Sequence, residues 1–230
     1  MVFRLLHLRS HPIQDQLLIE EALLRGNDQN WCIINEGSPP AIVMGISGKK
    51  EELIDCDRAA RDKIPVIQRF SGGGTVIVDE NTLFVTFICE KHLHDFPPYP
   101  EPIMRWTAEI YHDALCHPLF RLRENDYVIG DRKFGGNAQY IKKNRWLHHT
   151  SFLWDYSPSR MDYLLHPKKT PAYREGRTHL DFLCRMAEYF EDKTEVVNRI
   201  IQAIEKRYPL QKTSLEETLE IIAPSSPMQG

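Results

Sequence analysis

Three consecutive glycines, Gly72 to Gly74, follow Arg69 and Ser71 at the meeting point of two strand-like stretches. Glycine weakens a strand interior, because it adds backbone entropy to the unfolded chain and has no side chain to pack. Backbone N–H groups without a neighbouring Cβ can approach a ligand closely, and a guanidinium pairs well with carboxylate or phosphate. The stretch therefore fits a cradle for an anion, while a bulge or tight corner in a sheet explains it about equally well.

A second group of residues with chemical potential surrounds Lys133. This lysine stands beside Gly135 and Gly136, in a hairpin-like segment that follows Asn125 and Asp126. A lysine on a rigid strand, next to glycines that expose backbone amides, can neutralise a phosphate or a developing oxyanion. On spacing alone, a solvent-facing hairpin lysine is the more frequent case. We expect Arg69 to share a sheet with Lys133, and the two cations would then suit an acyl group joined to a phosphate.

Other nucleotide- and metal-binding patterns do not fit. A P-loop needs its glycines before a Lys-Ser/Thr pair and a helix, and a dinucleotide fingerprint also opens a helix, whereas a strand follows Gly74 here. His92 and His94 lie in a predicted loop, and the adjacent His148 and His149 point to opposite faces of a predicted strand. We therefore expect no metal site.

Composition is typical of a soluble globular protein. The chain has 230 residues, of which 42% are hydrophobic and 27% charged, enough for one large domain. Basic and acidic residues are mixed along the chain and leave a net charge of −3, so nucleic acid is not expected as the principal partner.

The compartment is expected to be the cytoplasm. Five widely spaced cysteines without a CxxC pattern indicate reduced thiols. No apolar run has the length of a membrane span, and the first residues resemble neither a signal peptide nor a transit peptide.

The residue pattern predicts an α+β fold, with strands mostly first and helices last. Strands are expected at residues 2–8, 31–35, 41–45, 83–89, 126–129, 132–134, 137–141 and 145–153. Helices are expected at residues 16–25, 51–61, 103–115 and 195–207, the last capped by Thr194. A further helix is expected to follow the capping box that begins at Ser214. Two hairpins turn at Gly130-Asp131 and at Lys142 to Asn144. Residues 1–223 are expected to form a single domain and residues 224–230 a frayed tail.

These motifs, taken in order, resemble those of lipoate–protein ligases. Arg69-Phe70-Ser71-Gly72-Gly73-Gly74-Thr75 resembles the arginine–serine–triple-glycine signature of the lipoate–protein ligase A family, in the lipoate/biotin protein ligase superfamily. Asn125-Asp126, followed by Gly130-Asp131-Arg132-Lys133-Phe134-Gly135-Gly136-Asn137-Ala138-Gln139, resembles its lysine-containing segment. His148-His149-Thr150 and Gly45, which ends an apolar strand, resemble two further segments. Each motif is modest, but their order and spacing from the first strand to about residue 205 are specific.

The resemblance implies a fold and a reaction. The fold is the catalytic domain of lipoate/biotin protein ligases, a central mixed sheet flanked by helices. In the reaction, ATP with Mg²⁺ activates lipoate or octanoate as an acyl-adenylate. A lysine of a lipoyl acceptor domain, from a 2-oxoacid dehydrogenase complex or the glycine cleavage H protein, then attacks the activated carbonyl.

The resemblance also implies a role for each matching residue. Lys133 would be catalytic, bridging the phosphate and acyl oxygens, and Gly45 would end a strand beside the pocket. The positions expected to bind substrate or acyl-adenylate are Arg69, Ser71, Gly72, Gly73, Gly74, Thr75, Asn125, Asp126, Gly136, Asn137, Ala138, His149 and Thr150.

Some positions depart from the family pattern. Gln68 stands where a second arginine is common, Ile46 follows Gly45 where an arginine is usual, and Thr150 stands where many members have glycine. The chain ends near the end of the catalytic domain of longer ligases. We therefore expect a short form without the C-terminal accessory domain, which either adenylates unassisted or needs a separate partner chain.

Alternative functions remain open. An octanoyl or lipoyl transferase of the same superfamily moves the acyl chain from a carrier protein through a cysteine thioester. Cys116 is the cysteine nearest in sequence to the Lys133 segment, and we expect it to be a buried residue near the end of its helix. A biotin ligase is less favoured, since no Gly-Arg-Gly-Arg loop is present. A non-catalytic module that binds acyl groups or lipoyl domains is a further possibility.

Overall fold

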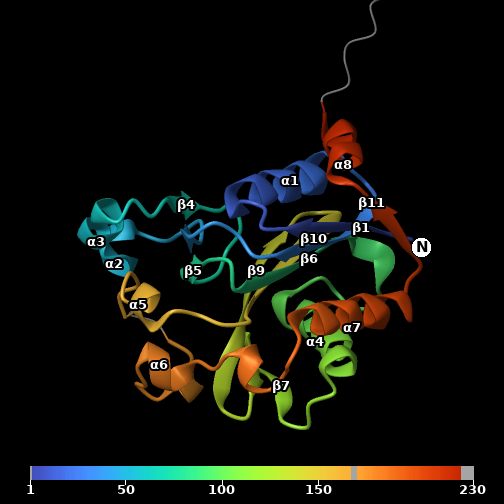
Figure 1. The fold of residues 1–230 in the computed structure, drawn as a ribbon. Coiled ribbons are helices and arrows are strands. Elements are labelled where there is room, and N and C mark those ends of the chain that lie inside the picture. Colours follow the sequence, from blue (N-terminus) through green and yellow to red (C-terminus); the bar gives the residue numbers. More distant parts are fainter. Residues whose placement is uncertain (1, 167–169, 224–230) are drawn as a thin grey trace, which may run out of the picture.

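The apolar stretches of the chain form the strands of a central eight-stranded sheet, in a computed structural model that describes residues 2–166 and 170–223 (Figure 1). In spatial order the strands are β11 (Leu210–Thr213), β1 (Phe3–Arg9), β2 (Asn30–Glu36), β6 (Thr82–Glu90), β10 (Arg145–Leu153), β9 (Arg132–Ile141), β8 (Asp126–Ile129) and β7 (Phe120–Arg123). β1 is parallel to both β2 and β11, and the other neighbours are antiparallel. The predicted α+β fold with a mixed central sheet is confirmed. The expected tail at residues 224–230 lies outside the described residues.

Helices cover both faces of this sheet. α1 (Ile13–Gly26) and α8 (Leu215–Ile222) pack on one face, and α4 (Pro100–Leu115) and α7 (Lys193–Glu205) pack on the other (Figure 1). α1 and α4 each bury an apolar stripe of the kind that an amphipathic helix turns toward a core. The two faces are called the α1 face and the α4 face below.

A second sheet of three strands carries the glycine-rich stretch. Its order is β4 (Val66–Gln68), β3 (Ala41–Met44), β5 (Val76–Val78). Arg69 directly follows β4, whereas Lys133 lies in β9 of the large sheet, so the expectation that both share one sheet is wrong. The two segments are nevertheless neighbours, because the loop between β4 and β5 lies against β9, where the Gly72 N–H donates to the Gln139 carbonyl oxygen (3.1 Å).

Most of the predicted local structure is confirmed. β8 and β9 turn at Gly130, whose φ is +65°, and β9 and β10 form the second hairpin. The capping box at Ser214 is present in α8. α7 is capped by Asp192 and not by Thr194, because the Asp192 carboxylate accepts from the Thr194 N–H. β4 and β5 (Val76–Val78) are the two strand-like stretches expected on either side of the glycines, whereas β7 and β11 were not predicted.

The helix expected over residues 51–61 is broken in two, α2 (Lys50–Leu53) and α3 (Cys56–Arg61). Ile54 is extended and bridges Leu164, and Asp55 caps α3 by accepting from the Arg58 N–H. Tertiary pairing thus overrides the local helical pattern. The remaining helices are short: η1 (Lys91–Leu93), α5 (Pro158–Met161), η2 (Ala172–Arg174), α6 (His179–Phe182) and η3 (Met186–Glu188). Throughout the part of the chain that the structure describes, no helix combines the length and the apolar character that crossing a membrane requires.

Candidate active site

The glycine loop, residues 69–75, is held in shape by its own arginine. Arg69 is only 6% exposed, and its Nη2 donates to the carbonyl oxygens of Gly72 (3.2 Å) and Gly74 (2.8 Å). Burial lowers the pKa of Arg69 to about 10, an effect that the charge of Glu20 opposes. The sequence suggested that this guanidinium pairs with an anionic ligand. In the structure its Nη2 instead donates to two carbonyl oxygens and so stabilises the shape of the loop.

Two glycines of the site are required by close packing. Gly73 has φ +119°, and a Cβ there would lie 2.6 Å from Arg69 Nη2 and 3.0 Å from the Asn137 carbonyl oxygen. A Cβ on Gly45 would lie 2.2 Å from the Gly73 carbonyl oxygen. Gly72 and Gly74 are different, because a Cβ on Gly72 would approach nothing closer than 3.8 Å and one on Gly74 nothing within 4 Å. Packing therefore explains Gly45 and Gly73 and leaves Gly72 and Gly74 available for another purpose.

Three polar atoms of the glycine loop are buried without a hydrogen-bond partner among the described residues. They are Arg69 Nε, Ser71 Oγ and Thr75 Oγ1. Each unsatisfied buried polar group costs about 1–3 kcal/mol, and native proteins contain few of them. Three on one short loop fit a loop whose hydrogen bonds are completed by a ligand.

A bulge in β9 turns Lys133 toward this loop. Val128 pairs with Lys133 and Tyr127 with Gly135, so Phe134 is an extra residue without a partner on β8. In a regular strand, residues three apart point to opposite faces. The extra residue brings Lys133 and Gly136 onto the α1 face instead, where a Cβ on Gly136 would lie 3.3 Å from Lys133 Nζ.

Lys133 is paired with a carboxylate beside it. Its Nζ lies 2.7 Å from Asp126 Oδ1, and the side chains of Lys133 and Asp126 are 25% and 7% exposed. The missing Cβ of Gly136 leaves space for the end of the lysine side chain. The structure therefore brings together Asp126, Lys133 and Gly136, and the glycine loop lies against the same strand, β9.

His149 and Ala138 complete the α1 face of the site. They are register partners on β10 and β9, and the Ala138 Cα would lie 3.4 Å from a Cβ on Gly73. His149 Nδ1 lies 3.0 Å from Glu20 Oε1 and 3.0 Å from Thr86 Oγ1. Because the Thr86 hydroxyl donates to Glu20 (2.7 Å), Nδ1 of His149 carries a proton and donates to the carboxylate.

Glu20 is the residue of this site that the sequence prediction missed. It is fully buried in α1, where Gln16 Nε2 also donates to its Oε1 (2.7 Å). A signal was available, since Gln16 and Glu20 stand four residues apart within the apolar stripe that contains Ile13 and Leu23. Polar residues at buried positions of a helix generally have buried partners.

Three of the predicted positions lie elsewhere. Thr150 is fully buried on the α4 face, where its hydroxyl donates to Asn137 Oδ1 (2.8 Å). Asn137 Nδ2 donates to the Asn125 carbonyl oxygen (2.9 Å) in the turn between β7 and β8. The side chains of Thr150 and Asn137 thus join the strands behind Lys133 and do not share its face.

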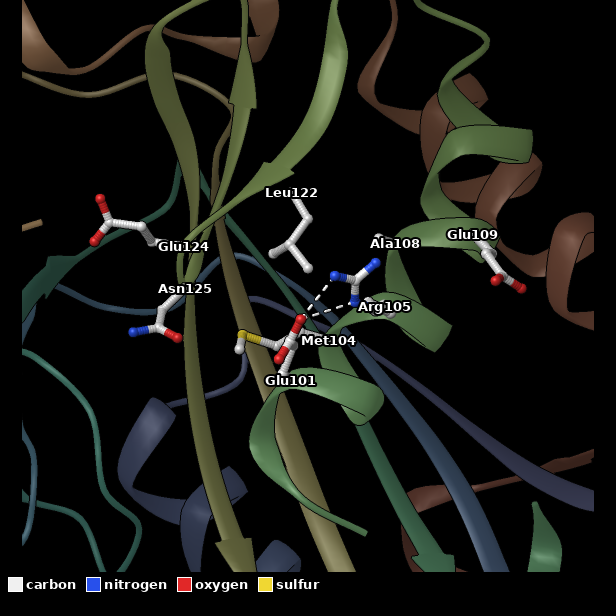
Figure 2. Close-up of a pocket in the computed structure, with 8 residues that line it drawn as sticks. All are labelled: Glu101, Met104, Arg105, Ala108, Glu109, Leu122, Glu124 and Asn125. Carbon is white, nitrogen blue, oxygen red and sulfur yellow. Dashed lines mark hydrogen bonds and ion pairs between the residues drawn. The ribbon is translucent and has the colours of Figure 1, made fainter. Parts of the chain in front are cut away.

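A cleft of about 580 Å³ opens on the α4 side of this turn (Figure 2). It is lined by Glu101, Met104, Arg105, Ala108, Glu109, Leu122, Glu124 and Asn125. Figure 2 shows Arg105 of α4 turned back onto Glu101, with which it forms an ion pair (2.7 Å). Of the predicted positions only Asn125 lines this cleft, which is therefore distinct from the Lys133 face.

The cysteine and metal predictions can also be compared with the structure. Cys116 is exposed, at the end of α4 with φ +50°, and its Sγ donates to the Asp113 carbonyl oxygen (3.1 Å). The expectation that it is buried is wrong, because the helix ends there and the chain turns into solvent.

Within residues 2–166 and 170–223, no group of three or more His, Cys, Asp or Glu side chains is placed to hold a metal ion.

Comparison with known proteins identifies relatives of this chain. A family model described as the lipoyl protein ligase A/B catalytic domain matches residues 12–206. The protein named inactive lipoate–protein ligase 2 of Plasmodium falciparum is 30% identical over 212 residues, which cover 77% of this chain and 55% of that protein. Lipoate-protein ligase LplJ of Bacillus subtilis is 27% identical over 182 residues, with 77% and 54% covered. The chain thus spans about half the length of these curated relatives.

Solved structures with a similar fold include a bipartite lipoate protein ligase from Thermoplasma acidophilum, described with its E2 lipoyl domain. The TM-score is 0.81 at 19% identity, over 96% of this chain and 91% of that one. A lipoate-protein ligase A bound with ATP gives a TM-score of 0.78 at 20% identity, over 96% and 93%. At these identities the likeness concerns the fold, and the predicted ligase-type fold is confirmed.

Proposed function

This chain belongs to the lipoyl protein ligase A/B catalytic-domain family, and we propose that it is a lipoate–protein ligase that uses ATP to attach lipoate or octanoate to a lysine of a lipoyl domain. One observation carries the proposal. The ion-paired Lys133 lies on the same sheet face as a glycine loop with three buried polar atoms that have no partner among the described residues. A cation beside unsatisfied donors suits an acyl group joined to a phosphate, because the phosphate is negatively charged and the carbonyl oxygen of the acyl group is polarised.

In the first step a carboxylate oxygen of the fatty acid attacks the α-phosphorus of ATP. The new O–P bond forms as the bond to pyrophosphate breaks, so pyrophosphate leaves with its electron pair. Lys133 neutralises charge on the oxygens of the transferred phosphate and of the acyl group. Ser71, Thr75 and the backbone N–H of Gly74 donate hydrogen bonds to these oxygens.

In the second step the acceptor lysine, as a free amine, attacks the activated carbonyl carbon. The C–N bond forms, the C–O bond to the phosphate breaks, AMP leaves and the amine nitrogen loses a proton. Lys133 stabilises the oxyanion that develops, so no protein nucleophile is required. The chain of the acid lies along the apolar strand residues of the α1 face, beside His149, where burial contributes about 0.8 kcal/mol per CH₂.

The described residues do not form a cage for Mg²⁺ around Lys133. Both oxygens of Asp126 already have partners, Lys133 and the Tyr173 hydroxyl. A Mg²⁺ ion that arrives with ATP would be held mainly by phosphate oxygens and water, and no step above depends on it.

The acceptor and any assisting chain are part of the same proposal. We take residues 1–223 as one catalytic domain that modifies lipoyl domains of 2-oxoacid dehydrogenase complexes or the glycine cleavage H protein. Where adenylation needs an accessory domain, a separate chain supplies it. The similar Thermoplasma acidophilum protein is described as a bipartite ligase together with its E2 lipoyl domain, which supports both points.

The test supplies an apo lipoyl domain with one of three acyl sources: lipoate plus ATP, presynthesised lipoyl-adenylate, or octanoyl-carrier protein. The mass of the acceptor reports transfer. We expect labelling from lipoyl-adenylate, and from lipoate plus ATP either alone or with an accessory chain. Labelling only from octanoyl-carrier protein, lost in Cys116→Ala, would replace the ligase by a thioester transferase.

A second candidate is a non-catalytic protein that binds lipoyl domains. It is favoured by the 30% identity to a relative whose name includes the word inactive. Binding of the apo acceptor without transfer from any of the three acyl sources would favour this candidate over the ligase.

A further inference from the structure

A tyrosine far along the chain contacts the carboxylate that pairs with Lys133. The Tyr173 hydroxyl donates to Asp126 Oδ2 (2.8 Å), while Lys133 Nζ lies 2.7 Å from Oδ1 of the same carboxylate. Tyr173 is 4% exposed and Asp126 is 5% exposed. Each oxygen of this buried carboxylate therefore has one partner, and the orientation of Asp126 is fixed from both sides.

The segment that carries Tyr173 also contacts the backbone of Lys133. We call residues 172–184 the strap. The Cys184 N–H donates to the Lys133 carbonyl oxygen (2.8 Å), and Leu183 forms a parallel bridge with Lys133. The strap thus contacts both members of the Lys133–Asp126 pair, although it lies about 50 residues further along the chain.

Tyr173 is itself firmly held. Its backbone N–H donates to Glu124 Oε1 (3.2 Å), and the guanidinium of Arg123 lies 4.6 Å from the centre of its ring. The ring of Phe182 is 5.1 Å away. Burial and the nearby charge of Asp126 raise the pKa of Tyr173 far above its usual value, so the hydroxyl keeps the proton that it donates.

We propose that Tyr173 is a positioning residue for Lys133, which it orients by fixing the carboxylate of Asp126. A tyrosine that only filled space would need no hydroxyl on a buried carboxylate. Without this hydroxyl, one oxygen of Asp126 is buried without a donor, so the carboxylate rotates and water enters beside it. The ion pair then loosens and Lys133 Nζ becomes more mobile. The consequence for catalysis rests on the proposed function, whereas the consequence for the lysine does not.

The test compares Tyr173→Phe with a matched control, Tyr163→Phe. Tyr163 is also buried in the same apolar cluster, and its hydroxyl donates to Asp62 Oδ2 (2.8 Å). Both variants therefore remove one tyrosine–aspartate hydrogen bond, and only the first removes it from the partner of Lys133.

The first readout is the rate at which an amine-acetylating reagent modifies Lys133, measured by mass spectrometry of peptides. Exposed Lys63 and Lys212 serve as internal references. Loss of one hydrogen bond to a charged group should raise the Lys133 rate about tenfold in Tyr173→Phe. Tyr163→Phe should leave it unchanged. Asp126→Asn, which removes the charge and keeps the volume, should raise it as much or more.

The second readout is the kinetics of adenylation. In Tyr173→Phe we expect kcat to fall about tenfold while KM for lipoate changes less than about twofold, because Lys133 acts mainly in the transition state. An unchanged or lower acetylation rate of Lys133 in Tyr173→Phe, in a folded variant, would overturn the proposal even with full ligase activity. Absence of ligase activity in the unsubstituted chain would count against the proposed function and leave the acetylation result to decide the role of Tyr173.

Discussion

Replacement of Gly73 by alanine should destabilise the protein strongly, whereas the same change at Gly74 should not. Gly73 has φ +119°, a backbone conformation that side chains rarely adopt, and its new Cβ would lie 2.6 Å from Arg69 Nη2. Backbone strain of this kind costs about 1–3 kcal/mol. Displacing Arg69 from the Gly72 and Gly74 carbonyl oxygens adds about 1–3 kcal/mol for the buried groups left unpaired.

The sum is a loss of about 4 kcal/mol in the free energy of unfolding, a large part of the stability of an ordinary domain. For a chain of this size it corresponds to a fall of about 10 °C in Tm. Urea titration followed by circular dichroism, together with a thermal scan, measures both quantities.

Gly74→Ala is the control, because a Cβ there meets nothing within 4 Å and φ at Gly74 is not in the positive range. It should change the free energy of unfolding by less than about 1 kcal/mol, and an increase is expected from the stiffer unfolded chain. If both variants unfold at the same urea concentration as the unsubstituted protein, the packing argument for Gly73 is refuted. If Gly74→Ala keeps its stability but loses acyl transfer, the open backbone at Gly74 faces the substrate.

Two further predictions concern buried polar groups. Glu20→Ala should lower the free energy of unfolding by about 3–5 kcal/mol, since Gln16, Thr86 and His149 all lose their acceptor. Glu21→Ala is the control: it removes an ion pair on the helix surface and should cost less than about 1 kcal/mol. Urea titration of both variants checks this, and equal losses would contradict it. Burial lowers the pKa of His148 from 6.5 to about 3. Between these two pH values the unfolded chain binds a proton that the folded protein does not. The free energy of unfolding therefore falls as pH decreases from about 6.5 toward 3. The slope from this group reaches about 1.4 kcal/mol per pH unit, and His148→Gln should remove it from the pH dependence of urea unfolding.

The fold was largely predictable because its signals are local. Alternation of apolar residues is set by the two-residue period of a strand, and Gly130 and Lys142 to Asn144 stand where hairpin turns need them. The helix over residues 51–61 was predicted incorrectly because Ile54 pairs with Leu164, a contact between residues far apart in sequence. β11 was missed for the same reason, since its partner β1 is at the other end of the chain.

The candidate site was only partly predictable. Residue types and spacing singled out Arg69 and Lys133, but not the direction in which Lys133 points. That direction depends on the bulge at Phe134, and a one-residue irregularity in pairing leaves no mark in the period of the sequence. Thr150 was assigned to the site because it stands next to His149 in the motif. Adjacent residues of a strand point to opposite faces, so with His149 on the α1 face the side chain of Thr150 lies on the α4 face.

Tyr173 carries no recognisable signal in the sequence. Its segment has neither the helical nor the strand period, and its contact with Asp126 joins parts of the chain 47 residues apart. Such a contact becomes visible only when the tertiary structure is known. The same holds for Arg69, whose role in bracing the glycine loop follows from the positions of two carbonyl oxygens.

The most direct test of the central claim is the rate at which Lys133→Ala transfers an acyl group from lipoyl-adenylate to an apo lipoyl domain. This substrate bypasses the activation step, so the result does not depend on an accessory chain. We expect the unsubstituted protein to lipoylate the acceptor. Lys133→Ala should do so at least about 100-fold more slowly, which is the usual effect of removing one group that stabilises an oxyanion. Circular dichroism checks that the variant is folded. Transfer by Lys133→Ala at the rate of the unsubstituted protein would contradict the account.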